Sequence, residues 1–273
     1  MEHKIKDLVS AQVGEHHKGD TDHYNHIVLT DEEKEAAISE ALRQARKKKH
    51  FFLQSQKYWE KVNKPVEYKR FDSKEALEFF LFRAKKINPK FEINEYNRDI
   101  IVKLALYFSC DETAAQSGLS LNKGIMLVGP VGCGKTTIMK AFQLNSANPF
   151  ALTSARKISD SFLSKDSGGE HVIRRYSNLL PAYPEQNFGY DHLGLCIDDL
   201  GVENVKKSFG NEVDVIGDII LNRYEQGLFN TTHFTANIGG EEIDEAYGVR
   251  ITSRLREMCN FIAFDHDTPD FRK

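Results

Sequence analysis

The chain has few cysteines and no long hydrophobic run. Its four cysteines lie far apart and in no metal-ligand spacing, which argues against a disulfide framework and against a zinc motif. No apolar segment approaches the length that spans a bilayer, and the first residues contain no hydrophobic stretch of the signal-peptide kind. We therefore expect a cytoplasmic protein that makes no membrane contact.

The net charge is low, but the charged residues are unevenly distributed. The formal net charge of the 273 residues is −3, which by itself indicates no class of partner. From Arg43 to Lys90, however, 15 Lys and Arg stand against 5 Asp and Glu, whereas from Ile101 onward the counts are 17 and 22. This difference predicts a basic front segment followed by a mildly acidic body. The length allows one large domain with an appendage, or two modest domains.

One octapeptide carries the strongest functional signal. Residues 129–136 read GPVGCGKT and fit the P-loop pattern G-x-x-x-x-G-K-[ST] without a mismatch. Residues 124–128 predict a short buried strand before the motif, and residues 137–142 predict a helix after it. Glycines let backbone N–H groups curl around phosphate oxygens. We therefore expect a nucleotide site formed by Gly129, Pro130, Val131, Gly132, Cys133, Gly134, Lys135, Thr136 and Thr137.

The last residues of this motif predict the ligands. Lys135 can reach the β- and γ-phosphates as a point charge, and the positive end of the following helix faces the same anion. The Thr136 hydroxyl can complete the coordination sphere of Mg²⁺. We expect ATP and Mg²⁺ as cofactors, although no base-contacting residue is readable in the sequence.

An acidic pair follows a second apolar strand. Residues 193–201 read LGLCIDDLG. A carboxylate at the C-terminal end of a strand near the P-loop is where such enzymes hold Mg²⁺, and Asp198 is the candidate for that role. Asp199 is placed to accept a proton from, or to orient, the water that attacks the γ-phosphate. An acidic pair at a strand end also occurs in helix caps and turns.

Further polar candidates lie downstream. The strand predicted around residues 232–236 ends at Asn237, whose amide is suited to bind the attacking water or the γ-phosphate, with Thr235 able to share the role. An ordinary turn asparagine is the alternative. Arg250 and Arg254 lie four residues apart on one predicted helix face. An arginine that reaches a neighbour's γ-phosphate stabilises the charge that develops in phosphoryl transfer, although two arginines alone on a helix would form a solvated face.

The N-terminal sequence predicts a flexible tail followed by a basic helix. Residues 1–30 are polar and include His16, His17, His23 and His26. Thr30 and Glu33 resemble a capping box and predict a helix over residues 31–49. Aromatic and basic side chains then alternate. Such a pattern suits a single-stranded nucleic-acid surface, and equally a helical module that packs internally or docks on a partner. The residues concerned are Phe51, Phe52, Lys57, Tyr58, Trp59, Lys61 and Lys64.

The boundary between the two parts is expected near Asn88 to Asn94. A helix that starts after Asp72 ends at Asn88 because Pro89 follows it. We expect a tail at 1–30, a helical basic partner-binding module at 31–90 and a nucleotide-binding domain at 91–273. Within that domain, strands alternate with helices, including one that Asn211 caps, and this order predicts an α/β fold with a parallel, doubly wound sheet.

In combination these motifs resemble one family, the AAA+ ATPases of the DnaC/IstB type, which comprise bacterial helicase loaders and ATPase subunits of transposition systems. The resemblance runs from about Asn94 to Lys273 and includes GPVGCGKTT, LCIDDLG, TAN, YGVRITSRLREM and DTPDFR. It implies a P-loop AAA+ sheet flanked by helices, without a C-terminal lid domain. Lys135 and Thr136 match the Walker A pair, Asp198 and Asp199 the Walker B acids.

The same resemblance implies roles for the remaining candidates. Asn237 matches the sensor-1 polar residue, and Arg254 matches an arginine finger that acts on a neighbouring subunit, with Arg250 assisting. Arg156 and Lys157 fall where family members contact single-stranded DNA. Asp199 departs from the glutamate that AAA+ proteins usually carry, which puts the hydrolysis rate in doubt.

The expected function is therefore that of a helicase-loader-like ATPase. It would form homo-oligomers on ATP and DNA, bind single-stranded DNA and engage a replicative helicase through its front module. A transposition helper that delivers a transposase has the same chemistry. Two other classes stay open: a P-loop kinase for a small metabolite, and a nucleotide-gated binding module with negligible turnover.

Overall fold

A computed structural model describes residues 26–62, 67–164, 168–201, 206–208, 211–237 and 239–272. The chain divides into two compact units, Met1–Pro65 and Val66–Lys273. His16, His17 and His23 of the predicted tail lie outside the described residues. None of the helices in the described ranges is long and apolar enough to cross a membrane.

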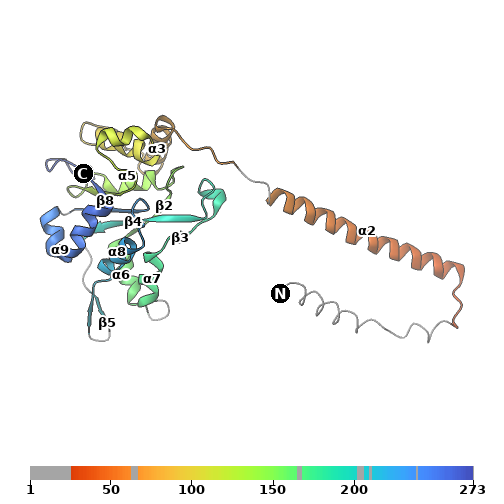
Figure 1. Ribbon diagram of the computed structural model, residues 1–273. Coiled ribbons are helices and arrows are strands. Elements are labelled where there is room, and N and C mark those ends of the chain that lie inside the picture. Colours follow the sequence, from red (N-terminus) through yellow and green to blue (C-terminus); the bar gives the residue numbers. More distant parts are fainter. Residues whose placement is uncertain are drawn as a thin grey trace. The chain divides into compact units, whose positions relative to one another are not determined.

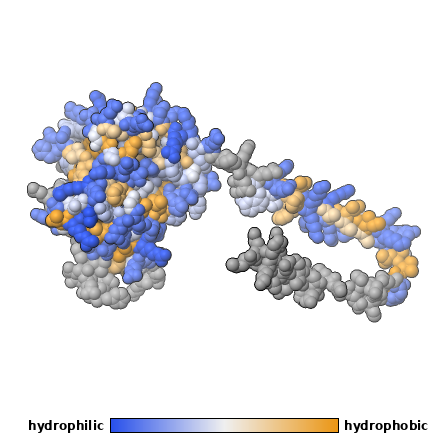
Figure 2. All heavy atoms as spheres, viewed as in Figure 1, coloured by the Kyte–Doolittle hydropathy of each residue, from blue (hydrophilic) through white to orange (hydrophobic). Residues whose placement is uncertain are grey.

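The first unit contains one long helix, α2 (Asp31–Val62), which is labelled in Figure 1. The predicted capping box is confirmed: the Thr30 N–H donates to Glu33 Oε2 at 2.8 Å, and the Glu33 N–H donates to Thr30 Oγ1 at 3.2 Å. The helix continues past the predicted end at residue 49 and includes the aromatic segment. Hydrophobic and hydrophilic stretches follow one another along this helix (Figure 2). Its exposed large side chains include Phe51, Phe52, Tyr58 and Trp59.

The boundary between the units differs from the predicted one. Helix α3 (Ser73–Ile87) belongs to the second unit because it packs on α4 (Arg98–Phe108) and α5 (Lys135–Phe142). The Phe80 and Phe142 rings stack with their centroids 4.4 Å apart. Such aromatic burial makes α3 part of the second unit rather than of a separate module.

The second unit is built on a six-stranded sheet. Five strands are parallel in the order β2-β4-β7-β1-β8, and the short β3 pairs antiparallel with the start of β4. The strands are β1 (Gly124–Val128), β2 (Phe150–Ser154), β3 (Leu180–Pro181), β4 (His192–Leu200), β7 (Thr232–Ala236) and β8 (Cys259–Ala263). The predicted parallel α/β sheet is confirmed. Because β7 lies between β1 and β4, the ends of these three strands meet at one edge.

Helices cover both faces of this sheet (Figure 1). Alternate residues of β1 face opposite layers: Ile125 and Leu127 pack with α3, α4 and α5, and Met126 packs with the helices of the other face. The latter helices are α6 (Ala155–Phe162), α7 (Glu170–Ser177), α8 (Val215–Glu225) and α9 (Gly240–Met258). Two short 3₁₀ helices (Glu112–Ser117 and Pro184–Gln186) and a small hairpin of β5 (Lys206–Ser208) with β6 (Asn211–Val213) complete the fold.

The predicted cap of α8 was wrong. Asn211 begins β6, and the helix starts four residues later, where the Asp214 carboxylate accepts a hydrogen bond of 2.8 Å from the Gly217 N–H. Aspartate and asparagine are comparable caps, so the local sequence did not distinguish the two positions. The hairpin takes up the residues that the prediction had placed in the first turn of the helix.

A fully buried histidine lies in the middle of the sheet. His233 of β7 accepts a hydrogen bond of 3.1 Å at Nδ1 from the Ile125 N–H, while its Nε2 has no partner. The rings of Phe108 and Phe150 surround it, with centroids 5.4 and 4.8 Å away. Burial, together with the positive charge of Arg223, lowers the pKa of His233 to about 3. The imidazole is therefore neutral in the native protein.

Candidate functional site

The P-loop connects β1 to α5 with a backbone that only glycine adopts readily. Gly129, Gly132 and Gly134 have φ angles of 158°, 84° and 102°, all positive. The Gly129 N–H donates to the Ala236 carbonyl at 3.2 Å, which fixes the start of the loop to the end of β7. The loop leads into the first turn of α5. The backbone N–H groups of that turn have no helical partners and can donate hydrogen bonds to an anion.

Lys135 lies inside this loop and is almost fully buried. Its ammonium donates to the carbonyls of Gly129 and Pro130 at 2.7 and 2.8 Å, and to Asn237 Oδ1 at 2.7 Å. Burial lowers the pKa of Lys135. These three acceptors hold the charge at the centre of the loop, and each is an uncharged oxygen that a phosphate oxygen can replace.

Asp198 lies beside the first turn of α5. Its Oδ1 accepts hydrogen bonds from Thr136 Oγ1 at 2.9 Å and from Thr235 Oγ1 at 2.6 Å. Burial raises the pKa of Asp198, and the two hydroxyl bonds oppose that rise. Within the described residues this buried carboxylate has no salt-bridge partner within 4.0 Å. A buried acid compensated only by hydroxyls is a favourable place for a cation.

Asp199 and Asn237 form the second polar pair of the site. The Asn237 Nδ2 donates to Asp199 Oδ1 at 3.2 Å, so the amide bridges Asp199 to Lys135. Asp199 has a φ of 56°, in the left-handed region that aspartate tolerates better than most residues. Its N–H donates to Thr235 Oγ1 at 2.9 Å. Thr235 thus orients both acids. At these acids the pairing of β4 with β7 is irregular, between Ile197 and Leu200.

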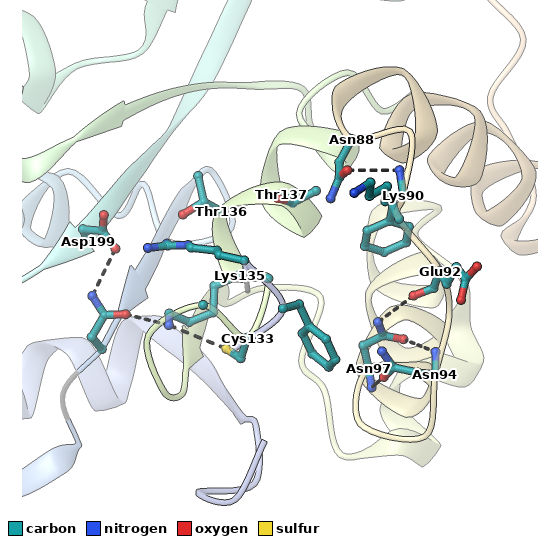
Figure 3. Close-up of a pocket in the computed structure, with 16 residues that line it drawn as sticks. Asn88, Lys90, Glu92, Asn94, Asn97, Cys133, Lys135, Thr136, Thr137 and Asp199 are labelled. Carbon is teal, nitrogen blue, oxygen red and sulfur yellow. Dashed lines mark hydrogen bonds between the residues drawn. The ribbon is translucent and has the colours of Figure 1, made fainter. Parts of the chain in front are cut away.

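Lys135, Thr136, Asp199 and Asn237 line one side of a cavity of about 540 Å³ (Figure 3), and Asp198 and Thr235 are not among its lining residues. The segment after α3 forms the facing side and contributes Asn88, Lys90, Glu92, Asn94 and Asn97 to the lining (Figure 3). The Asn97 side chain organises that segment: its Oδ1 accepts from the Asn94 N–H at 2.9 Å, and its Nδ2 donates to the Glu92 carbonyl at 3.1 Å.

Sequence reasoning missed this second wall of the cavity. It includes Phe91 from the segment between α3 and α4, and Phe271 and Arg272 from the segment after β8. The predicted domain boundary passed through the first of these segments. The N-x-x-N spacing of Asn94 and Asn97 was the available signal, because asparagines of this kind fix turns through side-chain to backbone bonds.

The donor set at Thr136 and Asp198 fits Mg²⁺. A hydroxyl and a carboxylate oxygen 2.9 Å apart beside a phosphate-binding loop match an ion that takes one or two protein ligands and fills its other positions with water and phosphate oxygens. The described residues contain no cluster of three or more His, Cys, Asp or Glu that would hold a metal by themselves.

The predicted arginines lie apart from the cavity. Among the described residues that line it, neither Arg250 nor Arg254 is found. Both belong to the part of α9 that follows a break at Gly248, where φ is 78°. Arg250 is exposed, whereas the Arg254 guanidinium lies 4.4 Å from the centre of the Tyr224 ring and donates to Tyr224 Oη at 3.1 Å.

The predicted nucleic-acid candidates are exposed at the start of α6, directly after β2. The Lys157 N–H bonds the capping Ser154 Oγ at 3.2 Å, and the Arg156 guanidinium lies 3.8 Å from Asp160 Oδ2. Because Ser154 of β2 pairs with Asp198 of β4, these two cations lie at the same edge of the sheet as the nucleotide site.

The P-loop follows β1, the two acids lie near the C-terminal end of β4, and Asn237 follows β7, the strand between these two. The second unit therefore has the parallel α/β sheet, with a glycine loop between β1 and α5, that the sequence predicted. No family model matches the chain, and no curated protein matches its sequence. The similar solved structures include a crystal structure of the DnaC helicase loader, with 16% identity and a TM-score of 0.44 over 66% of this chain and 96% of that one.

A second similar structure is AMPPCP-bound DnaA from Aquifex aeolicus, also with 16% identity and a TM-score of 0.44. The match covers 66% of this chain and half the length of that DnaA chain.

Proposed function

We propose that this protein binds Mg²⁺-ATP in the P-loop cavity and hydrolyses it to ADP and phosphate. The observation that carries the proposal is the chain of contacts from Lys135 through Asn237 to Asp199, beside the contact of Thr136 with Asp198. It joins a phosphate-binding cation, a polar sensor and an acid at one edge of the sheet. Such positioning is most of what phosphoryl transfer requires of a protein.

The individual roles follow from these contacts. The P-loop N–H groups and Lys135 bind the β- and γ-phosphates, and Thr136 and Asp198 hold Mg²⁺, which when bound neutralises charge on the phosphate oxygens. Asp199 orients the attacking water and accepts its proton. Asn237 keeps the Asp199 carboxylate in place and, because it also contacts Lys135, responds to the occupant of the loop.

Arg254 acts on the nucleotide of a neighbouring subunit. Its separation from the cavity supports action in trans and weighs against a small-metabolite kinase in which the arginines would close over their own site. Stacking on Tyr224 and the 3.6 Å approach of Glu257 hold the partly exposed guanidinium in a defined orientation. A pre-oriented arginine loses less side-chain entropy when it meets a γ-phosphate.

The biological role that we propose is that of a helicase-loader-like protein in DNA replication. Motif resemblance suggests it, and the aromatic and basic residues of α2 are suited to docking on a protein partner, a replicative helicase. Arg156 and Lys157 at the nucleotide edge of the sheet support contact with single-stranded DNA phosphates. A transposition helper that engages a transposase is the alternative partner assignment with the same ATPase core.

Mixing two inactive variants tests the shared site. Arg254→Ala should bind ATP as the wild type does but lose most of its ATPase activity, because removing an arginine finger costs about 10³-fold or more. Asp199→Asn should be inactive for a separate reason. A mixture should regain part of the activity, since some interfaces would combine an intact acid with an intact arginine.

The readout is phosphate release at a fixed total protein concentration and varied ratio of the two variants. Arg256→Ala on the same helix is the matched control: this exposed arginine bonds Asp244 at 3.3 Å and should have activity close to the wild type. A mixture that stays as inactive as its components would contradict action in trans.

A further inference from the structure

The chain after β8 runs along the outside of the P-loop. The Phe264 N–H donates to the Val128 carbonyl at 2.8 Å, and seven residues later the Phe271 N–H donates to the Gly132 carbonyl at 3.2 Å. Around the second contact, Asp270 accepts at Oδ1 from the Arg272 N–H at 3.0 Å, which forms a tight turn at Phe271. Residues 264–272, named here the tail segment, are thus bonded to the residue before the loop and to the middle of the loop.

The tail segment is packed directly on the loop glycines. A Cβ atom added to Gly132 would lie 1.8 Å from Asp270 Oδ1, and one added to Gly129 would lie 2.7 Å from the Phe264 Cβ. Neither position has room for a side chain. The absence of side chains at these two positions is therefore needed for the docking of the tail segment as well as for the approach of phosphate.

Two side chains of the tail segment line the nucleotide cavity. Phe271 is 45% exposed, and its ring centroid lies 6.2 Å from that of Tyr96, on the segment that forms the facing wall. Arg272 lines the same cavity, and its guanidinium has no ion pair among the described residues. A half-exposed ring and an unpaired cation at the mouth of a phosphate-binding cavity match the two parts of a nucleotide, its flat base and its anionic chain.

We propose that Phe271 and Arg272 complete the nucleotide site, with the Phe271 ring packed on the base and the Arg272 guanidinium near the polyphosphate. The inference rests on the proposed nucleotide function and extends it to a segment for which no role was predicted. Since the tail segment is bonded to the P-loop, a nucleotide that contacts both favours the docked tail, and the docked tail raises nucleotide affinity in return.

Equilibrium titration of Mg²⁺-ADP and Mg²⁺-ATP tests these side chains. Phe271→Ala should weaken both nucleotides by about tenfold, as loss of one base-stacking ring does. Arg272→Ala should weaken ATP more than ADP, because the guanidinium acts on the phosphate chain. His266→Ala, at an exposed tail position outside the cavity, is the matched control and should bind as the wild type does. Circular dichroism and the melting temperature check that each variant folds.

Lys135→Ala distinguishes failure of this inference from failure of the proposed function. If Lys135→Ala loses nucleotide while Phe271→Ala and Arg272→Ala keep wild-type affinity, the tail segment has no binding role and the inference is overturned. If Lys135→Ala itself binds normally, the proposed nucleotide function fails. An unchanged affinity in one tail variant removes the role of that side chain.

Hydrogen exchange tests the coupling separately. The Phe271 amide, which is bonded to the Gly132 carbonyl, should exchange more slowly when Mg²⁺-ATP saturates the protein. The His266 amide is the internal reference. Equal exchange of the Phe271 amide with and without nucleotide would overturn the coupling of the tail segment to the occupied loop.

Discussion

Asp199→Asn should slow ATP hydrolysis by about 10²- to 10⁴-fold while ATP affinity stays close to that of the wild type. This is the range that removal of a general base costs. The asparagine side chain has the same shape but cannot accept a proton from the attacking water. Because Asp199 contacts Asn237 rather than Lys135 or the P-loop backbone, its substitution leaves the phosphate-binding groups in place.

Asparagine is the appropriate replacement for a structural reason. Asp199 has a φ of 56°, and asparagine tolerates this left-handed conformation, whereas alanine would add backbone strain to the chemical change. The hydrogen bond to Thr235 involves the backbone N–H of residue 199 and is therefore retained.

The measurement is a single-turnover assay with saturating protein, accompanied by an ATP titration and a melting curve. Single-turnover rates separate chemistry from product release. Hydrolysis within a few-fold of the wild-type rate would show that Asp199 is not the base. A wild-type protein that binds ATP but does not turn it over would instead support the nucleotide-gated binding module.

The free energy of unfolding should fall steeply as the pH drops from about 6.5 toward 3, with His233 as the main cause. The pKa of His233 is lowered to about 3 in the native protein by burial first and by Arg223 second, against about 6.5 in the unfolded chain. Between these values the unfolded state binds the proton and the native state does not, so acid favours unfolding. The full difference is on the order of 5 kcal/mol.

Other groups around His233 do not titrate in this range. Tyr107 of α4 and Cys196 of β4 are neighbours whose pKa values burial raises, so both stay neutral in acid. Arg223 of α8 stays charged, since its pKa is lowered only to about 10. It is held by Thr232 Oγ1 at 2.7 Å and by the carbonyls of Tyr176, Asn178 and Thr231.

His233→Asn isolates this contribution. The asparagine oxygen can accept the Ile125 N–H in place of Nδ1, yet asparagine does not titrate. The variant should be less stable at pH 7 because the smaller side chain leaves a cavity, and its stability should change less between pH 7 and pH 4. Urea unfolding at several pH values measures both effects. A pH slope equal to that of the wild type would contradict the assignment to His233.

The parts of the site that were predicted from the sequence are those set by contiguous residues. The P-loop and the acidic pair depend on a strand, a turn and the few residues beside them, and the structure brings Lys135, Asp198, Asp199 and Asn237 together. Their catalytic and metal-binding roles stay predictions. Thr235, named only as a helper of Asn237, orients both acids through one hydroxyl.

The parts that were missed depend on contacts between distant segments. Phe271 belongs to the cavity because it bonds Gly132, more than a hundred residues earlier, and no periodicity in the sequence signals that contact. The assignment of α3 to the nucleotide-binding domain likewise depends on Phe80 stacking on Phe142. The end of α2 was misplaced because a basic run at residues 46–49 is typical of a helix C-terminus, although the aromatic residues after it are also compatible with helix.

Equilibrium titration of Mg²⁺-ATP into the wild type, Lys135→Ala and Lys140→Ala tests the central claim most directly. Lys140 lies on the same helix but is exposed and outside the cavity, so its loss should not matter. We expect saturable binding by the wild type and by Lys140→Ala, and an affinity lower by about two orders of magnitude for Lys135→Ala, since charge-assisted hydrogen bonds to phosphate are lost. Equal affinity in all three proteins, or no binding by the wild type, would contradict the account.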